Sequence, residues 1–269
     1  MPSDRRALCV GINRFPFAPV NQLNGCVKDA HDMAAVFRDL VGFSPADITI
    51  LTDQQATKAN ITAVLRDMVN AARAGTVKYI VFSLASHGTY VPDFSGDEPD
   101  NKDEAFCTYD LAPDGRGGWD LSTLLVDDEL CDLFLTLPAD VLLEVYLDTC
   151  HSGTGLRDLN LGVSRYAPPP SPAAAQALAT RTSRGLAGSL SDAGSQHHIL
   201  WSACRAEQSS YEHPPDTRLN GAFTYFWTRA MRASNNTLSR RQILQQVRAD
   251  ITAAGHNQEP QLQVNATTT

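Results

Sequence analysis

A histidine and a cysteine each follow a predicted buried strand and stand beside residues typical of tight turns. His87 follows the apolar segment 77–84 within Ser-His-Gly, and Cys150 follows 141–147 within Asp-Thr-Cys-His-Ser-Gly. A thiol attacks a carbonyl carbon when a nearby base takes its proton. The glycine after the histidine, Gly88, lets a backbone N–H group approach a reacting oxygen closely. The pattern indicates nucleophilic cysteine catalysis.

Simpler interpretations of both residues remain open. A cysteine after a buried strand is commonly a small packing residue, and a histidine in such a turn is commonly held by hydrogen bonds. His151 is a competing base, but its position next to Cys150 in the chain should direct it away from the thiol. The coincidence of both residues at strand ends favours Cys150 as nucleophile and His87 as its base.

Apolar patterns predict the elements that must position these two side chains. Strands are predicted at 7–12, 48–51, 77–84, 141–147, 198–203 and 261–264, and helices at 27–40, 57–74, 128–137, 221–231 and 239–251. Strands that alternate with helices predict right-handed crossovers and a parallel sheet. Such sheets bind ligands beyond the carboxyl ends of their strands, where His87 and Cys150 would lie.

Two segments differ in composition from the rest of the chain. Gly, Asp, Pro and Asn dominate 90–120, which predicts a long surface loop with a small hairpin in its second half. Pro, Ala, Ser and Gly dominate 164–195, which predicts a flexible linker. The linker separates a large region, 1–163, from a small region, 196–269, and both are expected to share one sheet.

Overall composition excludes several classes of protein. The 22 basic and 30 acidic side chains leave a net charge of −8, which argues against a nucleic-acid or anionic-membrane binder and favours a cationic ligand. No uncharged apolar run approaches the ~18 residues of a membrane span, so we expect a cytoplasmic protein. Six dispersed cysteines without a Cys-x-x-Cys pair suit neither a disulfide framework nor a zinc ribbon.

The two motifs resemble those of caspase-like cysteine peptidases, in particular metacaspases and the prokaryotic orthocaspases. Three further stretches are similar to that family: LNGCVKDA at 23–30, LLVDDEL at 124–130, and SACRAEQSSYE at 202–212 followed by GAFTYFW at 221–227. The resemblance spans nearly the whole chain. It implies a caspase-like three-layer α/β sandwich, with a mostly parallel central sheet of about six strands flanked by helices.

The resemblance also implies roles for individual residues. Cys150 would be the nucleophile, His87 the base, and Gly88 and Cys150 the oxyanion hole. An acidic pocket would prefer Arg or Lys before the cleaved bond, and its matching residues are Asp29, Asp148, Cys26, Ala85 and Ser86. Two carboxylates suit a guanidinium group and disfavour the aspartate that true caspases prefer. Ala85 departs from the serine common in the family, and Asp29 could instead cap a helix.

Calcium activates many metacaspases, and the resemblance implies Asp103, Asp127, Asp128 and Asp158 as candidate ligands. Oxygen-rich clusters suit Ca²⁺. The acidic run at 127–129 is also a good helix N-terminus, so this interpretation stays open. No other cofactor is expected.

A peptidase selective for basic residues that carries Arg165, Arg181 and Arg184 in a flexible linker has candidate self-cleavage sites. We therefore expect a zymogen processed there by itself or by an upstream protease, although an inert loop remains an alternative. Its partners would be protein or peptide substrates with Arg or Lys at the cut, and the enzyme would be a monomer. A non-catalytic or calcium-gated scaffold that binds a partner through the same cleft is the main alternative. Another α/β hydrolase is disfavoured, because no Gly-x-Ser-x-Gly motif is present.

Overall fold

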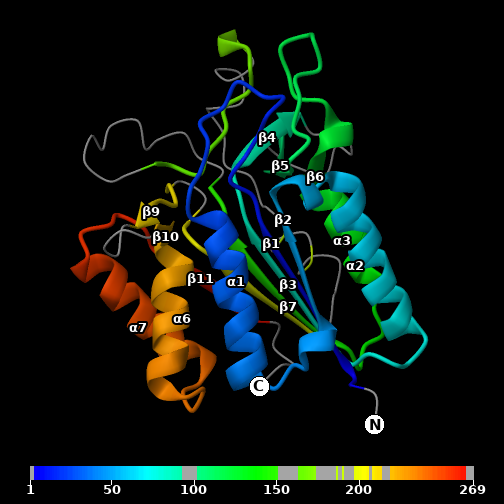
Figure 1. Cartoon of the computed structure of the whole chain (residues 1–269), viewed down its shortest axis with the longest axis vertical. Coiled ribbons are helices and arrows are strands. Elements are labelled where there is room, and N and C mark those ends of the chain that lie inside the picture. The colour runs from blue at the N-terminus through cyan, green and yellow to red at the C-terminus, as the bar shows by residue number, and fades with distance from the viewer. Residues whose placement is uncertain are drawn as a thin grey trace.

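The computed structural model describes residues 3–92, 102–150, 163–173, 186, 190, 197–205, 208–213 and 219–264. Within these residues, the central sheet consists of β1 (Arg5–Gly11), β2 (Ile48–Thr52), β3 (Tyr79–Ala85), β7 (Leu142–Asp148), β8 (His198–Ser202) and β11 (Gln261–Val264). Their spatial order is β11-β8-β7-β3-β1-β2 (Figure 1). All neighbours are parallel except β11, which runs antiparallel to β8 at one edge. Strands from both sides of the linker thus form one sheet.

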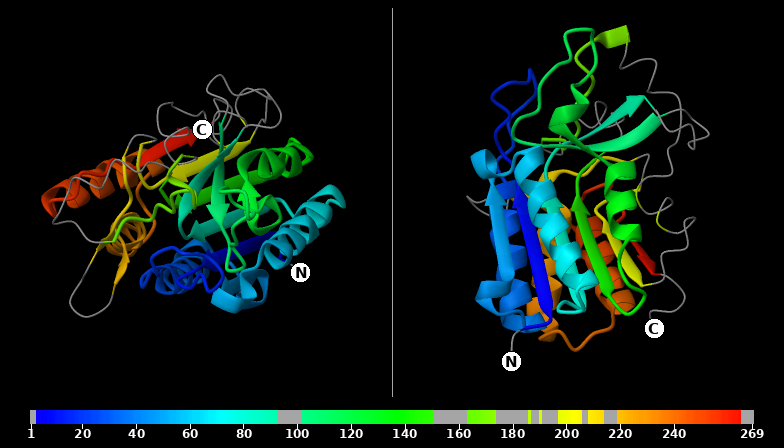
Figure 2. Two further views of the ribbon diagram at one scale, coloured as in Figure 1. Left: turned by 90° about the horizontal axis from the view of Figure 1, so that it is seen from above. Right: turned by 90° about the vertical axis from the view of Figure 1, so that its right-hand side faces the viewer.

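Helices cover both faces of this sheet. They are α1 (Cys26–Val36, continued by a π-helical turn at Phe37–Val41), α2 (Lys58–Arg73), α3 (Asp127–Leu135), α6 (Ala222–Ser234) and α7 (Arg240–Ala253). Single 3₁₀ turns occupy Pro45–Asp47, Asp53–Gln55 and Leu121–Thr123. Helices α1, α6 and α7 lie on one face and α2 and α3 on the other, as the two views of Figure 2 also show. The predicted three-layer α/β sandwich is confirmed.

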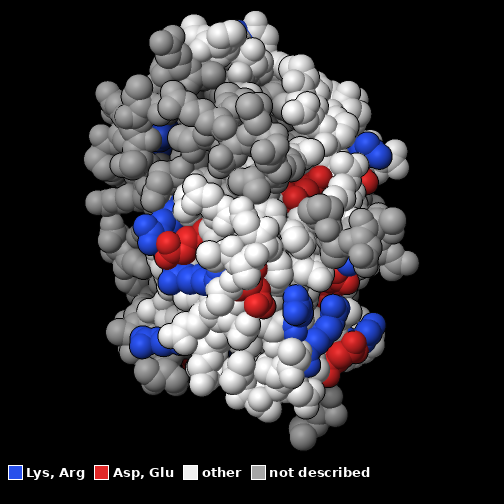
Figure 3. Space-filling model, turned by 90° about the vertical axis from the view of Figure 1, so that its left-hand side faces the viewer, with Lys and Arg blue, Asp and Glu red and all other residues white. Residues whose placement is uncertain are grey.

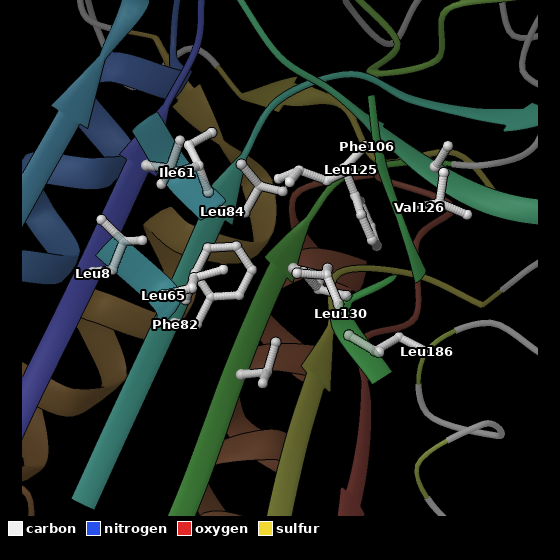
Figure 4. Packing of buried hydrophobic residues seen from close by; sticks show 14 of the residues in the cluster. Leu8, Ile61, Leu65, Phe82, Leu84, Phe106, Leu125, Val126, Leu130 and Leu186 are labelled. Atoms are coloured by element: carbon white, nitrogen blue, oxygen red, sulfur yellow. The ribbon is translucent and has the colours of Figure 1, made fainter. Parts of the chain in front are cut away.

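Side chains of the central strands point alternately to the two faces of the sheet, and each face carries a hydrophobic core. In β1, Leu8 and Val10 pack with α2 and α3, whereas Ala7 and Cys9 pack with α1, α6 and α7. Successive side chains of a strand point to opposite faces, so a strand buried on both faces is apolar throughout. Figure 4 shows the first core, in which Leu186 of the linker lies beside Leu130. Part of the linker is therefore packed into the fold.

A small antiparallel sheet stands beyond the carboxyl edge of the central sheet (Figure 1). It consists of β4 (Gly88–Pro92), β5 (Lys102–Cys107) and β6 (Leu124–Val126). The prediction of a surface loop with a hairpin only in the second half of 90–120 is wrong for β5, because the polar composition of this segment hid its buried Ala105 and Phe106. Lys102 is buried as well, with its ammonium group 3.8 Å from the centre of the Tyr90 ring. A second short ribbon pairs β9 (Glu212–His213) with β10 (Asn220–Gly221).

The first part of the predicted linker is ordered against this edge. Arg165 and Ala167 are fully buried, and residues 163–167 pair with neighbouring backbone. The expectation of an exposed arginine in a flexible segment is therefore wrong for Arg165. Arg181 and Arg184 lie outside the described residues.

Charged side chains on the molecular surface are mixed. On the face in Figure 3, described basic and acidic residues lie beside one another rather than in a patch of one sign. In the part of the chain that the structure describes, none of the helices has both the length and the apolar character that a bilayer crossing requires.

A buried carboxylate anchors the amino end of the central sheet. Glu144 of β7 accepts hydrogen bonds from Tyr79 Oη (2.6 Å), Tyr146 Oη (2.9 Å) and Trp201 Nε1 (2.9 Å), and from both arms of Arg240 (2.9 and 2.8 Å). Burial alone would raise the pKa of Glu144, but the hydrogen bonds and charge of Arg240 hold it below its ordinary value. Arg240 therefore compensates the negative charge of Glu144, a residue that is only 2% exposed.

We expect Arg240→Ala to destabilise the fold by about 2 kcal/mol, because it leaves the Glu144 carboxylate buried without its cation. Urea unfolding followed by circular dichroism measures the change. The matched control is Arg241→Ala, since Arg241 is the exposed neighbour on the same helix and should change stability by less than ~0.5 kcal/mol. Equal midpoints for the two variants would contradict the anchoring role of Arg240.

Candidate active site

Neighbouring strands bring the predicted nucleophile and base to one edge. Strands β3 and β7 are parallel, and their last residues, Ala85 and Asp148, are directly paired. His87 and Cys150 each follow two residues later, so they leave the sheet at the same level. Both residues therefore follow the carboxyl edge of the sheet on neighbouring strands, as the strand pattern predicts.

His87 is held in one tautomer. Its Nε2 lies 2.8 Å from the carbonyl oxygen of Asn21, which can only accept, so Nε2 carries the proton and Nδ1 keeps its lone pair. Phe15 covers the ring at a centroid distance of 5.0 Å. Burial lowers the pKa of His87 to about 4, with the Asn21 carbonyl opposing this shift. At neutral pH the side chain is an uncharged base.

Cys150 is fully buried at the carboxyl end of β7. Its thiol donates to the carbonyl oxygen of Gln208 at 3.3 Å. Tyr166 lies close enough for the two groups to interact electrostatically: burial raises the pKa of Tyr166 to about 12, and Cys150 adds to the effect. Tyr166, in the first part of the linker, thus lies near the thiol.

The segment 163–167 crosses the edge as an extended strand. The carbonyl oxygen of Arg165 accepts from Gly88 N at 2.9 Å, and Ala167 N donates to the carbonyl oxygen of Gly88 at 2.9 Å. On its other side, Arg165 N donates to the carbonyl oxygen of Ser210 at 3.0 Å. Backbone pairing on both sides is how an extended peptide is held at a sheet edge.

The Arg165 side chain fills the predicted acidic pocket. Its guanidinium group lies 2.5 Å from Asp29 Oδ2 and 3.0 Å from Asp148 Oδ1, and it also donates to the carbonyl oxygen of Asp148 at 3.0 Å. All three side chains are at most 3% exposed. Burial raises the pKa of Asp29 to about 7, with Arg165 opposing and Asp148 adding to the rise. The structure therefore brings the two predicted carboxylates together around a cation.

The other predicted pocket residues, Cys26, Ala85 and Ser86, form no ion pair with the Arg165 guanidinium group. Cys26 is buried within electrostatic reach of Arg165. The Ser86 hydroxyl donates to the carbonyl oxygen of Cys107 at 2.6 Å, so it supports the fold and not the guanidinium group, and Ala85 ends β3 without a polar side chain. Asp29 does not cap its helix, because it is buried in the ion cluster and the cap residue is Gly25.

Four residues that orient the two carboxylates were not singled out by sequence reasoning. Asn220 Nδ2 donates to Asp29 Oδ1 (2.8 Å) and Gly221 N to Asp29 Oδ2 (2.9 Å). Ser210 Oγ donates to Asp148 Oδ1 (2.8 Å), and the Thr224 hydroxyl and amide donate to Asp148 Oδ2 (2.7 and 3.1 Å). Three of the four lie in the segments 202–212 and 221–227, so the family resemblance was the available signal, but only the fold shows their partners.

Glu212 of β9 fastens the loop before α1. Its carboxylate accepts from the backbone N–H groups of Asn24 (2.7 Å) and Gly25 (2.5 Å). A Cβ at Gly25 would come within 2.9 Å of the Asn220 backbone, so only glycine permits this approach. Because α1 carries Asp29, this contact links the start of that helix to β9.

The candidate calcium residues gather only in part. Asp127 and Asp128 begin α3, beside β6, and the pairing of β5 with β6 directs Asp103 toward the same corner. Among the described residues, however, no group of three or more His, Cys, Asp or Glu side chains is arranged to hold a metal ion. Asp158 lies outside the described residues. Calcium binding stays a prediction.

Comparison with known proteins identifies the family. The model of the caspase domain family matches residues 4–269. Metacaspase-1 of Coccidioides immitis is 29% identical over 96% of this chain and 61% of its own length, and metacaspase-7 of Arabidopsis thaliana is 36% identical over 57% of this chain and 36% of its own length. The chain thus spans about one third to three fifths of these relatives.

Solved structures agree with the fold. A Geobacter sulfurreducens protein of known crystal structure is 25% identical with a TM-score of 0.69, and the match covers 99% of this chain and 95% of the other. Caspase-1 of Spodoptera frugiperda shares the fold at 12% identity, with a TM-score of 0.61 over 99% of this chain and 88% of its own. With the family model matching almost end to end, the chain belongs to the caspase domain family of cysteine peptidases and is related to the metacaspases.

Proposed function

We propose that this chain is a cysteine endopeptidase that cleaves after arginine or lysine. The observation that carries the proposal is Arg165. Its guanidinium group lies between Asp29 and Asp148 while its own carbonyl oxygen accepts from the Gly88 amide. This is the arrangement required of the residue before a scissile bond: the side chain is recognised, and the carbonyl rests on an oxyanion-hole donor.

The proposed reaction begins with the Cys150 thiol, which gives its proton to His87 Nδ1 as the sulfur attacks the carbonyl carbon. The carbonyl electron pair moves to the oxygen, where the Gly88 N–H and, in our proposal, the Cys150 N–H stabilise the charge. Collapse of this intermediate breaks the C–N bond, and His87 returns the proton to the leaving amine. Water then loses a proton to His87 and attacks the thioester, which releases the acid and restores the thiol.

Charge accounts for the proposed preference at the pocket. Two buried carboxylates with fixed hydrogen-bond donors around them stabilise a cation and repel an acidic side chain. The fork of a guanidinium group reaches both carboxylates at once, whereas a lysine ammonium is a single point charge, so arginine should be preferred to lysine.

Fluorogenic peptides test this function directly. We expect a peptide with arginine before the leaving group to be hydrolysed roughly 10³-fold faster, in kcat/KM, than the same peptide with aspartate. Cys150→Ala and His87→Ala should each abolish hydrolysis. Preference for aspartate would refute the pocket assignment, and no hydrolysis of either peptide, with calcium or with chelator, would favour a non-catalytic scaffold or an unprocessed zymogen.

We further propose that the intact chain is a zymogen cut between Arg165 and Tyr166. Arg165 already occupies the pocket, so it competes with any substrate at an effectively intramolecular concentration. The cut is made by the chain itself or by an upstream protease. Arg181 and Arg184 remain further candidate sites.

Incubation of the purified chain should produce a new N-terminus at Tyr166, identified by mass spectrometry, together with a gain of peptide hydrolysis. Cys150→Ala should stay intact, and Arg165→Ala should not be cut at this position, whereas Arg116→Ala, an exposed arginine, should be processed normally. Parallel samples with Ca²⁺ and with a chelator test calcium dependence. A cut after Arg165 in purified Cys150→Ala would show that another protease makes it.

The pocket also depends on the absence of a side chain at Gly221. A Cβ there would overlap Asp148 Oδ2 and come within 2.5 Å of a guanidinium nitrogen of Arg165, although a backbone φ of −65° suits any residue. Gly221→Ala should therefore lower kcat/KM for the arginine peptide by about 100-fold or more, through lost space alone.

The matched control is Gly75→Ala, where an added methyl group meets nothing within 4 Å. Its positive φ of 79° costs some stability, so it controls for a general loss of fold. Circular dichroism should report folded protein for both variants. Wild-type hydrolysis of the arginine peptide by Gly221→Ala would contradict the proposed pocket.

A further inference from the structure

A second thiol lies against the proposed nucleophile. Cys150 and Cys204 follow the paired strands β7 and β8, in which Leu147 is opposite Ser202 and Ala203 N donates to the carbonyl oxygen of Leu147 at 2.9 Å. The segments that follow β7 and β8 therefore run side by side beyond the sheet. Cys204 is half-buried, whereas Cys150 is buried.

Both thiols converge on one backbone oxygen. Cys150 Sγ lies 3.3 Å and Cys204 Sγ 3.4 Å from the carbonyl oxygen of Gln208. A hydrogen bond with the Cys150 side chain raises the pKa of Cys204 above its ordinary value, and burial adds to the rise. The two sulfur atoms are thus immediate neighbours.

Backbone geometry at this point suits a disulfide. Neighbouring strands lie ~4.8 Å apart, and disulfides join residues whose Cα atoms are ~4.4–6.8 Å apart. Cys150 and Cys204 are one residue out of register across such a pair, since Thr149 is the residue level with Cys204, whose thiol reaches the Thr149 carbonyl oxygen at 3.8 Å. The two thiols nevertheless meet at the Gln208 carbonyl oxygen, so each sulfur lies within reach of the other.

No other cysteine is placed to do this. Cys9, Cys107 and Cys131 are buried within the hydrophobic cores, and Cys26 lies in the pocket within reach of the Arg165 charge. Among the described cysteines, Cys204 alone is partly exposed and shares a hydrogen-bond acceptor, the Gln208 carbonyl oxygen, with Cys150.

We propose that Cys204 is a resolving cysteine that forms a reversible disulfide with Cys150 under oxidation by a peroxide. The inference rests on the proposed role of Cys150 as the nucleophile. The Cys150 sulfur attacks one peroxide oxygen, the O–O bond breaks, and the departing oxygen leaves as an alcohol or water, so Cys150 becomes a sulfenic acid. The Cys204 sulfur then attacks the Cys150 sulfur, water leaves, and the S–S bond forms; the peroxide has accepted both electrons.

The disulfide would switch the peptidase off and protect it. A sulfur in a disulfide is no nucleophile, so hydrolysis stops until a dithiol reductant restores both thiols. Without a neighbouring thiol, a sulfenic acid is oxidised further to a sulfinic acid, which dithiols do not reduce. Cys204 therefore decides whether oxidative inactivation is reversible.

The test compares hydrogen peroxide treatment of wild type, Cys204→Ala and the matched control Cys131→Ala, each followed by dithiothreitol. Activity is expressed relative to the untreated sample of the same protein. Wild type and Cys131→Ala should lose hydrolysis and recover at least about 80% of it, whereas Cys204→Ala should recover less than about 20%. Peptide mapping of oxidised wild type should find the residues 150 and 204 joined, at a mass lower by two hydrogens.

Peptide mapping does not need peptidase activity, so it separates this proposal from the proposed function. A disulfide between Cys150 and Cys204 in a chain that has been cut after Arg165 but hydrolyses no peptide would support the redox pair and refute the peptidase. Sulfinic acid at Cys150 in wild type without that disulfide, pairing of Cys150 with another cysteine, or a Cys150 that excess peroxide leaves unmodified would each overturn the proposal. Full recovery of Cys204→Ala would do the same.

Discussion

Burial of one guanidinium group between two carboxylates is the interaction on which the rest of the site depends. Arg165, Asp29 and Asp148 are almost completely withdrawn from water. Desolvation of three charges is costly, and their attraction repays it only when every remaining hydrogen-bonding position is satisfied. Amide, hydroxyl and backbone donors around both carboxylates meet most of this condition, although Nε of Arg165 has no hydrogen-bond partner among the described residues.

Those donors come from parts of the chain far apart in sequence, and this explains how the fold and the pocket depend on each other. Asp29 lies on α1, Asp148 at the end of β7, and their donors on β10, α6 and the segment before β9. The pocket forms only when the large and small regions complete one sheet. Removal of the cation alone would leave two buried like charges, so the site favours a replacement cation over an empty state.

Sequence reasoning found the strand ends well, because buried parallel strands are continuous apolar runs. His87 and Cys150 followed such runs, and Asp29 and Asp148 followed from the family resemblance. The β5 strand was missed, since Lys102 and Glu104 give it a polar composition although its apolar side chains are buried. Asn220 and Thr224 were missed because their partners are about 190 and 76 residues away along the chain, a separation that no local pattern reports.

The largest difference between the sequence-based prediction and the structure concerns Arg165. Small residues and prolines around it indicated a flexible linker, and an arginine in a linker is normally solvated. The local pattern contains no sign of a binding partner, because that partner is the pocket itself. Ion pairs with two carboxylates and backbone hydrogen bonds at the sheet edge stabilise residues 163–167 as an extended strand despite their composition. The Arg165 side chain is buried as a result. Segments that bind their own active site are therefore where composition is least informative.

A cut after Arg165 would not by itself empty the pocket. Arg165 N would still pair with Ser210, and the strand before it would still pair at Val163 with Glu212 and at Ser164 with Tyr211. The new carboxylate would lie at the Gly88 amide, which suits a negative oxygen better than the carbonyl it replaces. Such a cut would break a covalent bond but keep these contacts, so the bound product would inhibit until the strand leaves. Under the proposed zymogen mechanism, activation would therefore be two events, hydrolysis followed by release, and the contacts that hold Arg165 would determine the rate of the second.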